Sequence, residues 1–533
     1  MDKSWWKGAV IYQIYPRSFK DGNQDGIGDL DGITEELDYI RDLGVDAIWL
    51  SPIFRSPMKD FGYDISDYRE IDPLFGTMAD FDRLLEAAHE RGIKVILDQV
   101  YNHTSDQHPW FKESCSSKDN PKADWYVWVD GEKGTPPNNW LSYFGGEAWE
   151  WVETRKQYYL HLFVKEQPDL NWRHHEVRKQ VMQSIKFWLD KGVDGFRFDV
   201  VNLFYKDDRL RDNPVKYPEE LIAFNRHYHL YTRDRPETEG AVEEIRELMD
   251  FYDDRVSIGE VATELGQAQY FAYTRPNRLN LAFNFDFKEL RPFAAKTYIE
   301  HVKLNESVFR DFAWPSYVLG NHDSKRFLSK LGEGEDALRK AKVLAALLLT
   351  LRGTPFIYYG EEIGMREAEI PYEKIVDPQG KNLWPKNVGR DGCRTPMQWN
   401  SGLYAGFSRT EPWLPIGGDV QEVNVERQKA DPASMLQYYK QLIRIRKASD
   451  ALRFGRLEFL ETKEEALMAF FRIGESERNL VLLNFGDRAI GLNLEDFGVK
   501  TWRYLGGTTS HPVGFSGLSL SLEPYEAAIL ETN

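Results

Sequence analysis

Carboxylate and basic side chains stand at the ends of several short apolar runs of this sequence. Arg197 and Asp199 lie two positions apart in GVDGFRFDVV, Glu260 ends RVSIGE, and Asp323 ends SYVLGNHD. Side chains two apart on a strand point to the same side, so Arg197 and Asp199 can form a charge-assisted ion pair, and a permanent cation favours the ionised carboxylate. An ionised carboxylate can act as a nucleophile and a protonated one as a general acid. For Arg197 and Asp199 alone, a structural ion pair explains the pattern equally well.

These side chains need a scaffold that brings them together. Eight apolar or β-branched runs end in polar or turn residues and alternate with helical patterns; they cover residues 9–16, 45–52, 93–100, 193–200, 255–261, 280–286, 316–323 and 354–360. Strands that alternate with helices imply a parallel sheet, and eight of them predict a (β/α)8 TIM barrel. Asp98, Asn102 and His103 follow the third run. In such a barrel the carboxyl ends of the strands converge on one face, where active sites lie.

Two departures from this repeat predict further domains. The third and fourth runs are too far apart for one crossover, so we assign residues 104–169 to a small inserted domain, and 1–103 with 170–452 to the barrel. Asp431 and Pro432 predict the capped start of a closing barrel helix. Beyond it, the alternating strand patterns of 453–533 predict a C-terminal antiparallel β-sandwich.

The composition restricts the partners. Lys and Arg number 68 against 85 Asp and Glu, and the net charge of −17 argues against a nucleic-acid or anionic-membrane partner. The two cysteines, Cys115 and Cys393, fit a reducing compartment without a disulfide framework. We find no signal peptide and no bilayer-spanning apolar run. We therefore expect a cytoplasmic protein, a monomer or homodimer, that acts on a small uncharged substrate.

The polar residues fall in motifs that together resemble a known family. DQVYNH (98–103), GFRFDVV (195–201), IGEV (258–261) and GNHD (320–323) are similar, in order and spacing, to the signature regions of the α-amylase superfamily of glycoside hydrolases, family 13. QPDLN (167–171) and GRDGCRTPMQW (389–399) are similar to motifs of its bacterial α-glucosidase and oligo-1,6-glucosidase branch. The resemblance covers essentially the whole chain.

The resemblance implies a role for each matching residue. Asp199 is the expected nucleophile, Glu260 the general acid/base, and Asp323 the third carboxylate, which binds the sugar and helps to distort it. These residue types suit retaining hydrolysis, in which an ionised carboxylate attacks the anomeric carbon and a protonated carboxyl protonates the leaving oxygen. Arg390 is expected to close the pocket against Asp60, with Arg394 as the alternative, so that the enzyme trims chain ends. The full set of expected substrate-binding residues is Asp60, Tyr63, His103, Phe144, Phe163, Gln167, Arg197, Val200, His322 and Arg390.

The loop DGNQDGIGD (21–29) has the spacing of a metal-binding turn. Its oxygen-bearing positions match the first nine of an EF-hand, but the twelfth position is Gly32 rather than Glu. We expect a structural Ca²⁺ here, as in related α-glucosidases, with no part in the chemistry; a merely turn-forming Asp/Asn cluster is the alternative. The expected ligands are Asp21, Asn23, Asp25, the carbonyl of Ile27, and Asp29.

Two features bear on the bond that is cleaved. In the family, valine after the nucleophile, here Val200, is associated with α-1,6 linkages, and threonine or alanine commonly with α-1,4. An apolar valine cannot hydrogen-bond the leaving sugar, although valine is also simply a good strand residue. Segment 205–240, in contrast, resembles bacterial α-glucosidases that act on short disaccharides. We therefore expect an exo-acting α-glucosidase with a bias to α-1,6 linkages, such as that of isomaltose, and leave α-1,4 open.

Other functions exist on the same scaffold. In transglucosylases and sucrose isomerases a second sugar replaces the attacking water; sucrose isomerases of this family carry an arginine-rich loop after the NHD motif, where this chain has SKRFLSKLGEG. The non-catalytic heavy chains of amino-acid transporters have a membrane anchor and lack the three carboxylates that this chain keeps. We regard transfer as the alternative function and the binding protein as the remote one.

Overall fold

The computed structural model describes residues 4–264, 266–309, 313–509 and 517–532. Eight parallel strands close into a barrel in the order β1-β13-β12-β11-β10-β9-β5-β2. They are β1 (Ile11–Ile14), β2 (Ala47–Leu50), β5 (Lys94–Gln99), β9 (Gly195–Phe198), β10 (Val256–Gly259), β11 (Leu281–Asn284), β12 (Ser316–Val318) and β13 (Thr354–Tyr358). Each predicted strand run contains one of them, so the predicted TIM barrel is confirmed.

The barrel strands are apolar because both of their faces are covered. Side chains such as Ile11, Trp49 and Phe283 pack in one buried cluster of strand residues. On the outside lie α3 (Leu30–Glu35), α4 (Leu37–Leu43), α5 (Met78–Glu90), α7 (His175–Asp190), α8 (Glu237–Met249), α9 (Gln267–Tyr273), α10 (Ala295–Phe309), α11 (Gly334–Thr350) and α14 (Met435–Ala448). A parallel strand buried on both faces has a continuous apolar sequence, which is why these runs were recognisable. Within the described ranges, no helix has the length and apolar character needed to cross a membrane.

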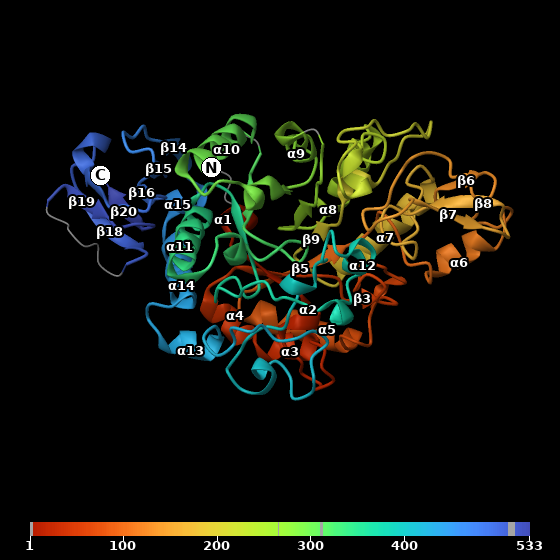
Figure 1. Cartoon of the computed structure of the whole chain (residues 1–533), viewed down its shortest axis with the longest axis horizontal. Coiled ribbons are helices and arrows are strands. Elements are labelled where there is room, and N and C mark those ends of the chain that lie inside the picture. The colour runs from red at the N-terminus through yellow and green to blue at the C-terminus, as the bar shows by residue number, and fades with distance from the viewer. Residues whose placement is uncertain (1–3, 265, 310–312, 510–516, 533) are drawn as a thin grey trace.

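Between β5 and β9 the chain leaves the barrel and forms a separate small unit. It contains α6 (Pro109–Ser116) and an antiparallel sheet in the order β6 (Trp128–Asp130), β8 (Gln157–Leu160), β7 (Trp149–Val152). Figure 1 shows this unit at the right-hand end of the molecule, away from the C-terminal sheet. An inserted domain after the third barrel strand is therefore confirmed, while its boundaries at 104 and 169 stay predictions.

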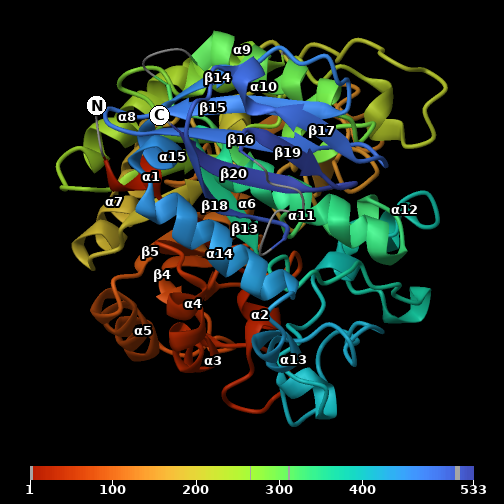
Figure 2. The same cartoon turned by 90° about the vertical axis from the view of Figure 1, so that its left-hand side faces the viewer.

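The C-terminal part is antiparallel, as expected. A five-stranded sheet has the order β14 (Arg456–Phe459), β15 (Leu467–Ile473), β16 (Arg478–Asn484), β20 (Ala527–Thr532), β18 (Trp502–Gly507), and β17 (Ile490–Asn493) pairs with β19 (Ser519–Leu522). Figure 2 shows the larger sheet facing the viewer above α14. Parts of the predicted domain ranges, residues 1–3, 265, 310–312, 510–516 and 533, lie outside the described residues.

The start of the closing helix α14 differs from the expectation. The Ser434 side chain, not that of Asp431, caps it by accepting the N–H of Gln437. Asp431 accepts the N–H of Ala433 at 2.9 Å and closes a turn through its carbonyl to Ser434 N–H, so the Asp-Pro pair precedes the helix by one turn. The cap was misassigned because Asp and Ser both suit that position and both occur before the apolar periodicity begins.

Candidate active site

Backbone pairing between β5, β9 and β10 places the first two catalytic candidates. The N–H of Asp199 donates to the carbonyl of Gln99 at 2.9 Å, and the N–H of Glu260 donates to the carbonyl of Phe198 at 2.9 Å. The parallel ladder thus continues one residue past the ends of β9 and β10. Asp199 and Glu260 therefore project from adjacent strand ends, at the carboxyl face of the barrel.

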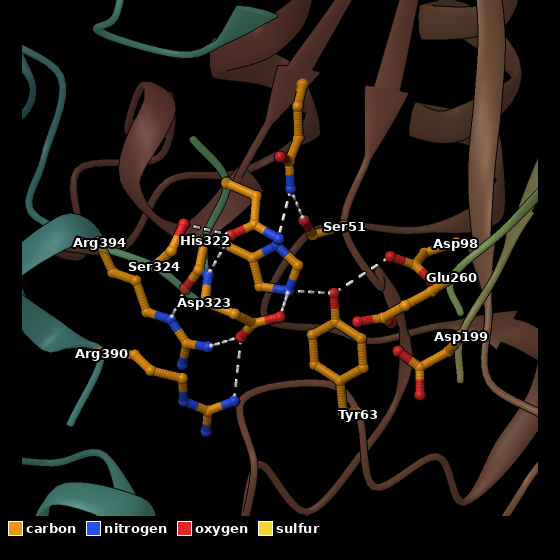
Figure 3. A network of polar contacts seen from close by, with 12 residues as sticks. Ser51, Tyr63, Asp98, Asp199, Glu260, His322, Asp323, Ser324, Arg390 and Arg394 are labelled. Atoms are coloured by element: carbon orange, nitrogen blue, oxygen red, sulfur yellow. Dashed lines mark hydrogen bonds and ion pairs between the residues drawn. The ribbon is translucent and has the colours of Figure 1, made fainter. Parts of the chain in front are cut away.

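Arg197 is fully buried and serves three carboxylates at once. Its Nη1 donates to Asp98 Oδ1 at 2.7 Å and to Asp199 Oδ1 at 2.6 Å, and its Nη2 donates to Glu260. The predicted pair of Arg197 with Asp199 is therefore present, but the single cation is divided among acids from three strands. Figure 3 shows Asp98, Asp199 and Glu260 grouped on one side of Tyr63.

This sharing changes the expected ionisation of Asp199. Burial raises the pKa of Asp199 well above its ordinary value; Arg197 lowers it, while Glu260 and Asp98 raise it further. Burial likewise raises the pKa of Asp98 to about 6 against the opposing effect of Arg197. Arg197 thus favours the ionised form of Asp199, as expected, while burial and the two neighbouring carboxylates oppose it.

Asp323 sits in the opposite electrostatic environment. Its carboxylate accepts hydrogen bonds from Arg394 Nη2 at 2.9 Å and Arg390 Nη1 at 3.1 Å, and lies 3.2 Å from His322 Nε2. Burial raises the pKa of Asp323, but the guanidinium groups of Arg390 and Arg394 outweigh it and hold the pKa far below its ordinary value. The pKa of Asp323 is therefore lowered while that of Asp199 is raised, and such a separation of carboxylate pKa values is typical of carboxylate catalysis.

His322 and Tyr63 connect these two groups of carboxylates. The rings are parallel, with centroids 5.3 Å apart, and Tyr63 Oη lies 2.6 Å from His322 Nε2 and 3.1 Å from Asp98 Oδ2. Gln13 Nε2 lies 2.8 Å from His322 Nδ1. Burial lowers the pKa of His322 well below its ordinary value. A neutral His322 can therefore hydrogen-bond a sugar hydroxyl without adding a further charge.

Arg390 forms the wall opposite this network. Its Nη2 donates to Asp60 Oδ1 at 2.7 Å and to Asp377 Oδ1 at 2.6 Å, and its guanidinium lies 4.7 Å from the ring centroid of Phe144. Arg394 contacts Asp323, and no contact of it with Asp60 is observed among the described residues. Of the two candidates, the structure thus places Arg390 against Asp60. Asp377 is a partner that the sequence did not point to.

Gln167 of the inserted domain and His103 of the barrel continue the wall. Gln167 Nε2 donates to Asp60 Oδ2 at 3.2 Å and lies 3.1 Å from His103 Nε2. Burial lowers the pKa of His103 to about 3, so its ring is neutral at pH 7. Behind them, Lys206 forms a buried ion pair with Asp169 at 2.7 Å. No motif of the sequence pointed to Lys206.

The side chains described above line a cavity of about 170 Å³. Of the predicted catalytic and substrate-binding residues, Arg197 and His322 lie behind its surface, and the others line it: Asp60, Tyr63, His103, Phe144, Phe163, Gln167, Asp199, Val200, Glu260, Asp323 and Arg390. Sequence analysis missed three further lining residues, Tyr143, Ala262 and Gln379. A signal for Gln379 was present, because Asp377-Pro378 is an N-cap followed by proline at the first position of α12 (Pro378–Leu383).

Val200 has an unusual backbone. Its φ of 35° and ψ of 45° are left-handed, a conformation rarely adopted by a β-branched residue. The N–H of Val200 points to Glu260 Oε2 at 3.4 Å, and its side chain packs with Trp140 and Trp149 of the inserted domain. Backbone strain of this kind persists only where the surrounding structure imposes it. Val200 thus lines the cavity and joins the barrel to the aromatic core of the insert.

In the predicted metal loop, most side-chain oxygens accept hydrogen bonds from backbone N–H groups of the same segment. Asp21 accepts the N–H of Gly26 at 2.8 Å and the hydroxyl of Ser408 at 2.5 Å, and Asp29 accepts the N–H of Gly32 at 2.7 Å as the cap of α3. Asp25 Oδ1 accepts the N–H of Ile27, and Asn23 Oδ1 accepts that of Asp25. No three or more His, Cys, Asp or Glu side chains in the described part of the chain are grouped to hold a metal ion. That grouping does not count Asn23 or the carbonyl of Ile27, so the calcium ion stays a prediction.

Comparison with known proteins agrees with this geometry. Residues 13–455 match the family model of the alpha amylase catalytic domain, and residues 457–529 match that of the maltogenic amylase C-terminal domain. The chain belongs to the alpha-amylase family. This confirms the predicted family and that the chain is an enzyme of the glycoside hydrolase type.

Individual members of the family are similar over nearly their whole length. A probable alpha-glucosidase of Rhizobium meliloti (strain 1021) is 46% identical, with 92% of this chain and 90% of the relative covered. An oligo-1,6-glucosidase of Parageobacillus thermoglucosidasius is 41% identical, with 93% of both covered. The crystal structure of XgtA, an alpha-glucosyl transfer enzyme, superimposes with a TM-score of 0.94 at 42% identity and covers 100% of both chains. The likeness therefore extends to the insert and the C-terminal domain.

Proposed function

We propose that the protein is a retaining, exo-acting α-glucosidase that releases glucose from the non-reducing end of short α-glucosides, with α-1,6 linkages preferred and α-1,4 linkages open. The observation that carries the proposal is the sorting of charge around one small cavity, which we call the glucose pocket. On one side, Asp199 and Glu260 share one cation, Arg197, and burial raises the pKa of Asp199. On the other side, two arginines keep Asp323 ionised.

The chemistry follows from these positions. Asp199 attacks the anomeric carbon of the terminal glucose while Glu260 gives its proton to the glycosidic oxygen, so that the bond to the leaving sugar breaks and a glucosyl-aspartate ester forms. Glu260 then takes a proton from water, the water oxygen attacks the anomeric carbon, and glucose and free Asp199 result. Arg197 stabilises the Asp199 carboxylate that leaves in this second step. Asp323 binds hydroxyl groups of the sugar through a fixed negative charge.

The decisive experiment measures kcat/KM for glucose release from isomaltose and maltose side by side, with Asp199→Asn as the blank. We expect faster cleavage of isomaltose, because Val200 presents an apolar wall to the leaving sugar. Faster cleavage of maltose means that segment 205–240 determines the linkage, and the α-1,6 preference is then wrong. Activity on neither sugar contradicts the proposal and directs the search to sucrose and trehalose.

Glucosyl transfer is the second candidate, favoured by the similarity to XgtA. A second sugar in place of water attacks the same glucosyl-aspartate, so the two reactions share every residue of the pocket. The ratio of transfer products to free glucose at low sugar concentration distinguishes them. If transfer products exceed free glucose at low sugar concentration, or if sucrose is rearranged there, the assignment as a hydrolase is wrong and glucosyl transfer is the function.

We retain calcium as a proposal for loop 21–29, as a stabilising ion outside the reaction. The spacing of its oxygen-bearing residues supports it. A bound ion adds RT ln(1 + [L]/Kd) to stability, so we expect a lower Tm in EDTA than in millimolar Ca²⁺, and no such difference in Asp21→Asn. Equal Tm values for the wild type in both conditions contradict the site.

A further inference from the structure

A second and larger cavity lies behind the wall of the glucose pocket. We call it the outer cavity; its volume is about 750 Å³. Neighbouring residues of the chain alternate between the two spaces: Lys59 and Phe61 line the outer cavity while Asp60 lines the glucose pocket, and Pro378 and Gln379 divide in the same way. Glu166 and Gln167 repeat this division, and Phe163 lines both spaces. The partition between the two spaces is therefore formed by the same segments of the chain, whose neighbouring residues face opposite sides.

The lining of the outer cavity suits an uncharged polyhydroxyl ligand. Its volume falls in the range of about 300–1,000 Å³ that is usual for small-molecule sites. Phe61 and Phe163, both half-buried, supply aromatic surface, on which sugar rings stack. The charged lining residues are three lysines and three glutamates, so neither an anion nor a cation is favoured: Lys59, Lys165, Lys381, Glu147, Glu150 and Glu166.

Asp377 fixes the part of the partition that is closed by Arg390. Asp377 is fully buried; its Oδ1 accepts Nη2 and Nε of Arg390 at 2.6 and 3.1 Å, and its Oδ2 accepts the backbone N–H of Arg390 at 2.7 Å. With these hydrogen bonds made, the remaining guanidinium N–H groups of Arg390 donate to Asp60 and Asp323. Gly389, with φ of 80°, allows the close approach, because a Cβ there would lie 2.6 Å from Asp377 Oδ2.

We infer that the outer cavity is a second binding site, for glucosyl units of an α-linked glucan, and that Asp377 is the positioning residue that holds Arg390 across the passage to the glucose pocket. This rests on the proposed function, since it explains why only a terminal glucose fits. Without the Asp377 carboxylate, Arg390 keeps its charge but loses its bidentate anchor. A longer chain can then extend through the partition, and internal bonds reach Asp199 and Glu260.

The test uses α-linked glucose oligosaccharides, in both linkages, whose non-reducing end is capped by a 4,6-O-benzylidene acetal. Removing one partner of a buried charge pair weakens the interaction that holds the other partner by more than a factor of about ten. We therefore expect no cleavage of the capped substrate by the wild type, and a rise of about tenfold or more over that background in Asp377→Asn. The KM of the variant for uncapped disaccharides should rise more than its kcat falls.

Two further variants separate positioning from folding. Asp391 accepts the backbone N–H groups of Val376 and Asp377 at 2.7 and 3.0 Å and so holds the same loop without pairing with the Arg390 guanidinium. Asp391→Asn should therefore show no gain on the capped substrate. Asn382 is exposed and lines only the outer cavity, so Asn382→Trp added to Asp377→Asn should remove the gain but leave disaccharide cleavage as in Asp377→Asn.

The possible results distinguish a failure of the exo-acting function from a failure of the inference about Asp377. Cleavage of the capped substrate by the wild type contradicts the exo-acting function itself, not the role of Asp377. A folded Asp377→Asn without a gain overturns the inference, and so does a gain that Asn382→Trp does not affect. If Asp377→Asn does not fold, Arg390→Met opens the partition from the side of the cation, and its failure to cleave the capped substrate overturns the inference equally.

Discussion

The two sides of the glucose pocket differ in burial and in the kind of contact that forms them. On the side of Arg390, the buried carboxylates of Asp60 and Asp377 hold one guanidinium in place. On the side of segment 205–240, the surface is exposed, with Tyr217 58% and Leu221 67% accessible. That side borders the pocket through an aromatic contact, since the ring centroids of Phe224 and Tyr143 lie 4.2 Å apart and Tyr143 lines the pocket.

The difference separates two kinds of recognition. Buried ion pairs have one low-energy geometry, because displacing either partner leaves an unpaired charge away from water. Exposed rings and loops can shift at little cost. If the pocket binds a terminal glucose, as proposed, we expect a rigid wall to hold that glucose and an adaptable surface to contact the leaving sugar, and the four predictions that follow test this contrast.

Glu260→Gln, between the two sides, should have the largest effect. Loss of the general acid lowers kcat on isomaltose by about 10²–10⁴-fold. On an aryl α-glucoside, whose leaving group needs no proton, the variant should retain glucosylation. Because Glu260 raises the pKa of Asp199, its replacement lowers that pKa, and the acid limb of kcat/KM moves to lower pH. An acid limb that stays in place, or moves up, refutes the coupling.

Asp60→Asn tests the rigid side. Arg390 keeps Asp377 and Asp323 but loses the carboxylate that fixes it at the pocket wall. Truncating one partner of a buried charge pair costs about 2–5 kcal/mol, so kcat/KM for disaccharides should fall by about 100-fold. Steady-state kinetics with either disaccharide measures it. A change below about threefold shows that the wall is not held by this pair.

Val200→Thr lies on the border of the two sides. The hydroxyl adds a hydrogen-bonding group beside the leaving sugar, and a single such change in an apolar pocket is worth about 1–3 kcal/mol. We expect the ratio of kcat/KM for isomaltose over maltose to fall by about tenfold. Val200→Ile, which keeps the wall apolar, is the matched control; a ratio that changes equally in both variants points to packing against Trp140 and Trp149 instead.

Tyr217→Ala on the adaptable side should have the smallest effect. Exposed side chains away from special features contribute within about 0.5 kcal/mol, so kcat/KM should change by less than about threefold on both disaccharides. The thermal unfolding temperature should not change measurably. A loss comparable to that of Asp60→Asn would remove the contrast between the two sides.

The catalytic candidates were predictable because their signal is local. Asp199 and Glu260 each follow directly on a buried strand, Asp323 lies five residues past the end of β12, and the strand ends of a barrel meet at one face. Arg390 was identified only through the family motif, and Asp377 was not identified at all. Asp377 lies in a stretch without strand or long-helix periodicity, where residue spacing does not indicate which way a side chain points.

By itself, the sequence determined the barrel, the antiparallel C-terminal domain and the residues at the strand ends, because burial on both faces and side-chain alternation are properties of short segments. Only the tertiary structure decided how charge is distributed. Arg197 is shared by acids from β5, β9 and β10, and Arg390 meets Asp60 from 330 positions away. A pKa depends on every neighbour and on the depth of burial, and both exist only once the barrel has closed.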